Sequence, residues 1–264
     1  MQRDAPVRRL ALLIEYAGTA YGGSQYQKNA PTIQGSLERA LSSLTGEPIR
    51  VALAGRTDAG VHAKGQVASF VTASRHPLET FPRGLNALLP EDISVRAASE
   101  VPLAFDPRRQ ALSRWYRYAI RVRPQRPAVL RRWVWHMAQP LDVDAMAAAA
   151  GLLLGRHDFA AFTQPSQARR RPTERMVATA RLGGTKELSC FDIEANSFLP
   201  QMVRRLVGAL VEVGLSKRTV AEFEGLLREA RPGAASFAAP ARGLCLMKVR
   251  YESGLFDDET DEDL

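Results

Sequence analysis

The chain has 264 residues, 45% of them hydrophobic and 24% charged, so it can bury the core of one large or two small domains and is not a disordered chain. Its formal net charge of +8 indicates a polyanionic partner, with nucleic acid ahead of an anionic membrane surface. No apolar run is long enough to cross a bilayer or to serve as a signal peptide, so we expect a soluble, cytoplasmic protein.

The charge is distributed unevenly along the chain. The last thirteen residues, 252–264, contain seven acidic residues and no basic one. The other 251 residues hold 36 basic and 21 acidic residues, a net charge of +15. We expect a disordered acidic tail and a body that attracts a polyanion, although charge alone also fits a basic surface that only keeps the protein in solution.

The first hundred residues predict strands alternating with helices. Arg9–Tyr16 has apolar side chains at every second position, which is typical of a strand. The loop at 17–28, rich in Gly, Tyr and Gln, could stack on bases or simply connect two elements. Thr32 can cap a helix that should stop near Gly46. Two strands and a short helix are expected at residues 49–53, 66–71 and 78–88.

The rest of the chain repeats this alternation beyond a possible seam at Pro102–Pro107. A long strand at 111–122 should place Tyr116 and Trp115 on opposite faces, because side chains alternate along a strand. The remaining expected elements are an Ala-rich helix from Asp142 or Asp144 to Gly155, a basic loop at 164–175, strands at 176–182 and 188–195, a helix at 198–213 capped by Ser197, a helix from Thr219 to Glu229 and a closing strand at 244–251.

This pattern contains neither a Rossmann glycine fingerprint nor a phosphate loop. It favours an α+β fold, with two sub-domains of largely antiparallel, mixed sheet and helices packed on it. We expect an N-terminal sub-domain at 1–104, a C-terminal sub-domain at 105–251 and the tail at 252–264, with the chemistry where the two sub-domains meet. No cofactor motif and no His/Cys cluster is present in the sequence, so no metal site is predicted.

The densest chemistry lies at Ala54–Ala63, where two glycines allow a tight turn around Arg56, Thr57 and Asp58. An arginine beside a carboxylate favours the ionised form, and an ionised, fixed aspartate can act as a nucleophile or a base. Alternatively, Asp58 caps a turn with Thr57 and pairs with Arg56 for structure alone.

The segment Gly55-Arg56-Thr57-Asp58-Ala59-Gly60-Val61-His62-Ala63 closely resembles the signature of the TruA family of tRNA pseudouridine synthases. Further stretches similar to the family occur along nearly the whole chain, at Leu85-Asn86 with Leu89–Ile93, Arg114–Tyr118, His157–Phe159, Met202–Gly208 and Ala239–Leu244. Two positions depart from its pattern. Ser24 stands where the family usually has a tryptophan, and Asp106-Pro107 stands where it has His-Ala.

The resemblance implies the pseudouridine synthase fold, with an active-site cleft between the two sub-domains. It also implies the conversion of uridine to pseudouridine at positions 38, 39 and 40 of the tRNA anticodon stem-loop, by a homodimer. The reaction only rearranges atoms, so no cofactor is expected. Two rivals remain: a catalytically silent RNA-binding module of the same fold, and an N-glycosidase that releases uracil with water.

The resemblance also implies roles for single residues. Asp58 is the catalytic carboxylate, Tyr116 stacks on the extruded base and serves proton transfer, and Arg204 pairs with Asp58. Without it, Tyr116 would be one more residue on the apolar face of its strand, and Arg204 an exposed helix cation. The expected substrate-binding residues are Tyr116, Arg56, His62, Lys64, Arg169, Arg170 and Arg171, and Arg131 and Arg132 are further candidates for phosphate contacts.

Overall fold

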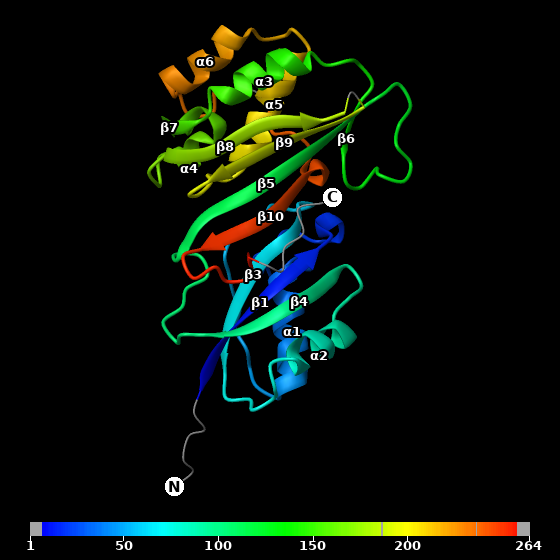
Figure 1. The fold of residues 1–264 in the computed structure, drawn as a ribbon, viewed down its shortest axis with the longest axis vertical. Coiled ribbons are helices and arrows are strands. Elements are labelled where there is room, and N and C mark those ends of the chain that lie inside the picture. The colour runs from blue at the N-terminus through cyan, green and yellow to red at the C-terminus, as the bar shows by residue number, and fades with distance from the viewer. Residues whose placement is uncertain (1–6, 186, 236, 258–264) are drawn as a thin grey trace. The chain divides into compact units, whose positions relative to one another are not determined.

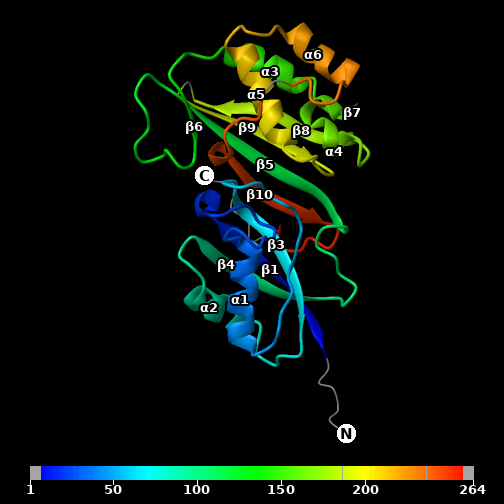
Figure 2. The same cartoon turned by 180° about the vertical axis from the view of Figure 1, so that it is seen from behind.

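The computed structural model describes residues 7–185, 187–235 and 237–257 (Figures 1 and 2). The chain forms two compact units, Met1–Leu112 with Leu246–Leu264, and Ser113–Cys245. The expected seam between residues 104 and 105 lies eight residues before the observed division. Most of the C-terminal strand, Leu244–Tyr251, also belongs to the first unit, where it pairs with the strand His62–Thr72. Such a pairing between distant positions leaves no mark on local periodicity.

The first unit is a sheet with helices on it. Its elements are β1 (Arg8–Tyr16), α1 (Ile33–Thr45), β2 (Ala52–Leu53), β3 (His62–Thr72), α2 (Thr80–Leu88), β4 (Ile93–Val101) and β10 (Leu244–Tyr251). The strand order is β4-β1-β3-β10, with β1 antiparallel to both β3 and β4 and β2 antiparallel to β3. Figures 1 and 2 show α1 and α2 on the same face of this sheet. β1 therefore lies in the middle of the core, and its residues 10–14 are almost completely buried.

Local signals place α1 where the sequence predicts it. The Thr32 side chain accepts a hydrogen bond from the backbone N–H of Gly35, which satisfies one of the unpaired donors at the helix start. The helix ends at Gly46, whose backbone is left-handed (φ 73°), a conformation that glycine adopts without steric cost. Both predictions are confirmed.

The second unit has the same general build. Its elements are β5 (Ala111–Val122), β6 (Trp135–Met137), α3 (Val143–Gly151), β7 (Gly155–Asp158), α4 (Pro165–Ala168), β8 (Glu174–Gly184), β9 (Leu188–Ala195), α5 (Met202–Gly214) and α6 (Val220–Glu229). The strand order is β5-β9-β8-β7, antiparallel at each step, while β6 pairs with β5 in parallel. Helix α3 packs against α5, α6 and β8. The α+β prediction, with largely antiparallel strands and packed helices, is confirmed.

The expected start of the helix at Phe198, capped by Ser197, is wrong. Helix α5 begins at Met202, after Gln201 in a left-handed conformation (φ 61°). The cause is Pro200, since the residue before a proline is pushed out of the helical region. The expected basic loop at 164–175 also contains the short helix α4 and the start of β8. In the part of the chain that the structure describes, no helix is long and apolar enough to cross a membrane.

Candidate active site

Asp58 lies on a loop between β2 and β3, residues 54–61, which we call the Asp58 loop. The backbone N–H of Val61 donates to the carbonyl of Asp58 at 3.1 Å, and Gly60 is left-handed (φ 79°), so residues 58–61 form a turn. The Asp58 side chain is half-exposed and Arg56 is exposed. The Asp58 loop therefore carries a half-exposed carboxylate and an exposed cation.

Buried polar groups from other elements fix the base of the Asp58 loop. Gln66 on β3 clamps Gly55, with its side-chain nitrogen 2.8 Å from the Gly55 carbonyl and its side-chain oxygen 3.2 Å from the Gly55 nitrogen. The Tyr16 hydroxyl at the end of β1 lies 2.9 Å from the Thr57 hydroxyl. Gln66, Tyr16 and Thr57 are all buried. Because buried polar groups are costly unless paired, these bonds hold the loop in one conformation.

Ser24 supports the same loop from behind. Its hydroxyl accepts a hydrogen bond from the Thr57 backbone N–H at 2.8 Å, and its own N–H donates to the Thr57 carbonyl at 3.1 Å. Ser24 is completely buried, and Gly23 before it is left-handed (φ 114°). A Cβ at Gly23 would lie 2.9 Å from the Thr57 carbonyl oxygen. Gly23 and Ser24 therefore allow their segment to pack directly against Thr57, the residue before Asp58.

His62 is the first residue of β3 and is 2% exposed. Its Nδ1 accepts a hydrogen bond from the Gly18 backbone N–H at 3.1 Å, which places a neutral ring's proton on Nε2. Gly18 belongs to a short 3₁₀ helix, Gly18–Ala20, and a Cβ there would lie 1.9 Å from the Val61 carbonyl oxygen. His62, which the sequence predicts to contact RNA, is therefore buried in the structure and supports the end of the Asp58 loop.

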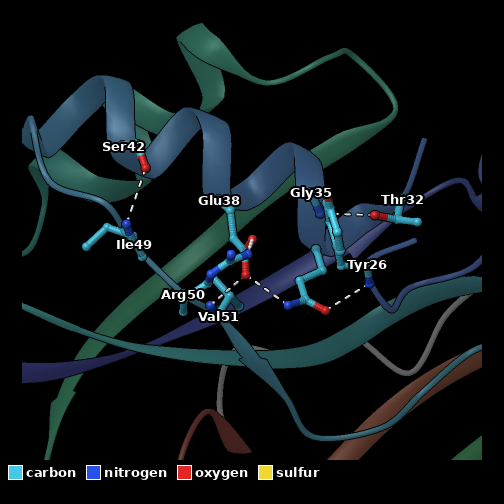
Figure 3. Close-up of polar contacts among 9 residues, drawn as sticks. Tyr26, Thr32, Gly35, Glu38, Ser42, Ile49, Arg50 and Val51 are labelled. Carbon is cyan, nitrogen blue, oxygen red and sulfur yellow. Dashed lines mark hydrogen bonds and ion pairs between the residues drawn. The ribbon is translucent and has the colours of Figure 1, made fainter. Parts of the chain in front are cut away.

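Helix α1 fixes the chain that enters the Asp58 loop, as Figure 3 shows. The buried Glu38 carboxylate accepts hydrogen bonds from the Val51 backbone N–H and the Arg50 guanidinium, both at 3.0 Å, and from the Gln34 side-chain amide at 2.8 Å. Farther along the helix, the Ser42 hydroxyl accepts from the Ile49 N–H at 3.3 Å. Side chains of α1 therefore hold the backbone of residues 49–51. The strand expected at residues 49–53 is shorter in the structure and comprises only Ala52–Leu53.

In the second unit, Tyr116 lies on β5 opposite Ile193 of β9 and is 7% exposed. Its ring meets Phe198 edge to face, with centroids 5.1 Å apart. Tyr118, two residues on, is fully buried and its hydroxyl donates to the Pro240 carbonyl at 2.8 Å. Burial raises the pKa of the Tyr118 phenol, so this residue stays neutral.

Arg204 lies on α5, half-buried, and its Nε donates to the Ala239 carbonyl at 2.7 Å. In return, the Ala239 N–H donates to the Arg204 carbonyl at 2.9 Å. Arg204 and Tyr118 therefore anchor the consecutive carbonyls of Ala239 and Pro240, within the segment that resembles the TruA family. Arg205 has a lowered pKa, caused first by burial and then by the charge of Arg204. The sequence motifs alone did not predict these contacts of Tyr118 and Arg204 with the 239–240 segment.

The remaining cationic candidates are spread over both units. Lys64 is half-buried on β3 of the first unit. Arg169, Arg170 and Arg171 follow α4 in the second unit and are all exposed. Within the described ranges, no group of three or more His, Cys, Asp or Glu residues could hold a metal ion. The first unit thus holds Asp58, Arg56, His62 and Lys64, and the second unit holds the other candidates.

Comparison with known proteins decides the family. A family model described as tRNA pseudouridine synthase matches residues 12–108 and 149–252, which is most of the chain. The chain belongs to this family. It is 43% identical to tRNA pseudouridine synthase A of Geotalea uraniireducens (strain Rf4), over 93% of the chain and 100% of that protein. It is 46% identical to tRNA pseudouridine synthase A of Chloroflexus aurantiacus (strain ATCC 29366 / DSM 635 / J-10-fl), over 94% of the chain and 91% of that protein.

These matches confirm the resemblance to the TruA family. As a tRNA pseudouridine synthase, the protein is an isomerase that converts uridine in tRNA to pseudouridine. In the structure, the side chains at Ser24 and Asp106 both accept hydrogen bonds from nearby backbone. Ser24 uses its hydroxyl to hold Thr57, a contact that a tryptophan could not make. Asp106 accepts hydrogen bonds from the N–H groups of Arg108 and Arg109, at 2.9 and 3.0 Å, which lower the pKa of its carboxyl.

Proposed function

We propose that this enzyme isomerises uridines at positions 38, 39 and 40 of the tRNA anticodon stem-loop, with Asp58 as its nucleophile or base. The observation that carries the proposal is the Asp58 loop itself. Its carboxylate is half-exposed on a turn, while the residues just before it, Gly55 and Thr57, are fixed by hydrogen bonds from the buried Ser24, Gln66 and Tyr16. Curated relatives along 93% of the chain carry the name tRNA pseudouridine synthase A, which supports the same substrate.

The reaction breaks the C1′–N1 glycosidic bond, turns the uracil and joins C1′ to C5. The C5 proton is then lost and N1 gains one, so no atom is added and no water is consumed. One fixed carboxylate can serve this exchange, either as a nucleophile or as a base. We propose that Tyr116 stacks on the extruded base and that Arg204 acts on the same uridine as Asp58.

A uridine within a stem-loop must first leave the stack, at a cost of about a few kcal/mol. Phosphate contacts from cations can offset this cost, because each contact releases counterions from the RNA. We propose Arg56 and Lys64 in the first unit, and Arg169, Arg170 and Arg171 in the second, for this role. His62 would contribute by keeping the start of β3 against Gly18. The enzyme would act in the cytoplasm as a homodimer.

The proposal is tested by mapping pseudouridine in an unmodified tRNA transcript, with carbodiimide labelling and primer extension. Wild type is compared with Asp58→Ala and with Asp144→Ala, which removes an exposed acidic residue from the first turn of α3. We expect signal at positions 38–40 for wild type and Asp144→Ala, and none for Asp58→Ala. The melting temperature and tRNA affinity of Asp58→Ala should stay near those of wild type.

Other results would overturn parts of the proposal. Tight binding by wild type without any pseudouridine would indicate a silent RNA-binding module. Release of free uracil would indicate an N-glycosidase. Signal at other tRNA positions would keep the chemistry and change the target. A loss of stability in Asp58→Ala that matches its loss of binding would make Asp58 a structural residue.

A further inference from the structure

A cavity of about 640 Å³ opens in the second unit beside the loop that joins β5 and β6. This loop is the long green segment beside β6 in Figures 1 and 2. We call the cavity the arginine pocket. Its lining residues are Arg126, Pro127, Ala128, Arg131, Arg132, Val134, His136 and Arg242.

The lining is strongly basic. Four arginines and one histidine face the arginine pocket, and none of its lining residues is an aspartate or glutamate. Arginine stays charged in proteins, and its planar fork of donors matches the oxygens of a phosphate. A concave surface with charges of one sign concentrates the field and attracts an ion of the opposite sign. A solvated basic face would also show exposed arginines, but it would not converge them on one cavity.

The walls of the arginine pocket are held in place by the fold. Arg242, from the 3₁₀ helix Ala241–Gly243, donates through Nε to the Val134 carbonyl at 3.2 Å. It thereby meets the loop from more than a hundred positions away in the sequence. His136 Nε2 donates to the Arg123 carbonyl at 2.7 Å, which closes the two ends of the loop. Val134 is 4% exposed and packs inward. These contacts fix Arg242, His136 and the loop backbone at Arg123 and Val134 before any ligand arrives.

Apolar surface lies next to these charges. Val129, Leu130 and Trp133 on the same loop are 89%, 39% and 44% exposed. A second cavity of about 320 Å³ shares Pro127 and Ala128 with the arginine pocket and is also lined by Arg121 and Arg123. A free phosphate ion would need only the charges. A nucleotide chain presents alternating phosphates, sugars and base faces, and therefore matches arginines interleaved with apolar and aromatic side chains.

We propose that the arginine pocket binds a backbone phosphate of the tRNA substrate, with the neighbouring apolar side chains against the adjoining sugar or base. This inference rests on the proposed function, since it takes tRNA as the ligand. It adds a binding site on the β5–β6 loop to the cations near the Asp58 loop and near α4. Its part in the reaction is to hold tRNA, because phosphate contacts position an RNA and carry no base identity.

The test measures tRNA affinity over a range of salt concentrations for three variants. Arg126→Gln with Arg131→Gln removes two exposed cations from the arginine pocket. Ala128→Phe fills the pocket at an exposed position without changing the net charge. Arg228→Gln with Arg231→Gln is the matched control, because it removes two charges from α6 and the segment after it. Melting temperatures of all variants establish that each is folded.

We expect Arg126→Gln with Arg131→Gln to weaken tRNA binding by roughly tenfold. The salt slope, which is the steepness with which the logarithm of the affinity falls with the logarithm of the salt concentration, should decrease by about one or two, because each lost phosphate contact lowers it by close to one. Ala128→Phe should weaken binding with its charge intact, and the Arg228/Arg231 control should bind like wild type. Phosphate ethylation interference on full tRNA should show one or two phosphates that matter for wild type and not for the Arg126/Arg131 variant.

Three results would overturn the inference. One is wild-type affinity and salt slope in both pocket variants. Another is an equal loss of affinity in the Arg228/Arg231 control, which would make the effect one of net charge. The third is inorganic phosphate binding that the pocket variants lose while tRNA affinity stays unchanged, which would indicate a small-anion site. All these readouts are binding measurements, so they separate a failed pocket from a wild-type enzyme that forms no pseudouridine.

Discussion

The Asp58 loop and the arginine-rich segments of this enzyme are held in opposite ways. Buried, neutral groups fix the Asp58 loop: the Ser24 hydroxyl, the Tyr16 hydroxyl and the Gln66 amide all bond to residues 55–57. The arginines that follow α4 are exposed instead, as are Arg126, Arg131 and Arg132 on the β5–β6 loop. Buried hydrogen bonds therefore set the geometry of the Asp58 loop, while the arginine-rich segments contribute exposed positive charge.

The roles proposed for the two regions account for this difference. A reacting carboxylate must be placed within a fraction of an ångström, because a displacement of about 1 Å can cost a hundredfold in rate. Attraction to a phosphate chain varies slowly with distance and sums over many contacts. We therefore expect single substitutions around the Asp58 loop to have large effects on stability and turnover, and single arginine substitutions to have small, additive effects on binding.

The largest effect is expected at Gly18. Alanine there would place its Cβ 1.9 Å from the Val61 carbonyl oxygen, and backbone cannot move aside as a side chain can. The shift would also strain the Gly18–His62 hydrogen bond. We expect Gly18→Ala to lower the free energy of unfolding by about 3 kcal/mol and to abolish most turnover, measured by urea denaturation and pseudouridine formation.

Gly151 offers the matched control for this substitution. It ends α3, is exposed, and has no atom within 4 Å of an added Cβ among the residues described. Alanine favours a helix over glycine by up to about 1 kcal/mol, so Gly151→Ala should leave stability unchanged or raise it. Equal stability of Gly18→Ala and Gly151→Ala would show that the Asp58 loop is not rigidly supported.

A smaller effect on stability is expected at Ser24. Alanine would leave the Thr57 N–H buried without its acceptor, at a cost of roughly 1–3 kcal/mol in the free energy of unfolding. Because the neighbouring residue is Asp58, we expect kcat to fall by about ten- to a hundredfold while the tRNA dissociation constant barely changes. Single-turnover assays well below the melting temperature separate the rate effect from unfolding.

Ser189 serves as the control for Ser24. It is also buried, but its hydroxyl has no hydrogen-bond partner in the described structure. Ser189→Ala should therefore cost nothing, or stabilise the fold slightly. A wild-type kcat in folded Ser24→Ala would contradict the positioning role, and so would the same loss of kcat in Ser189→Ala.

The contrast between the two regions also explains how much the sequence predicts. Elements with local signals are found: β1 by its alternation, α1 by Thr32 and Gly46, and α6 by Thr219 at its start. The structure adds that Thr219 and Glu222 form a capping box. The sequence does not predict strand β4, residues 93–101, because its run of small and polar side chains has no clear alternation. The start of α5 is misplaced because its apolar pattern outweighs Pro200 in the prediction.

The motif around Asp58 indicates the chemistry, yet it cannot reveal what holds the loop. Ser24 contacts Thr57 across 33 positions, and Tyr16 contacts it across 41. The arginine pocket joins Arg242 to Val134 across 108 positions. Such contacts arise from strand pairing and packing, which bring together residues that no local pattern links. The sequence motif therefore does not predict which residues position the Asp58 loop.

The smallest effect for each residue is expected at Arg169, Arg170 and Arg171. All three are exposed, so changing them together to glutamine should alter the free energy of unfolding by no more than about 0.5 kcal/mol each. The affinity for unmodified tRNA should fall, and the salt slope should drop by up to about three, while kcat at saturating tRNA stays near that of wild type. Binding titrations at several salt concentrations measure this directly.

The corresponding triple lysine variant keeps the charge and should retain the slope, because a phosphate contact through a point charge still releases a counterion. A triple glutamine variant with unchanged affinity would place the tRNA elsewhere and leave the arginine pocket as the main electrostatic contact of the second unit.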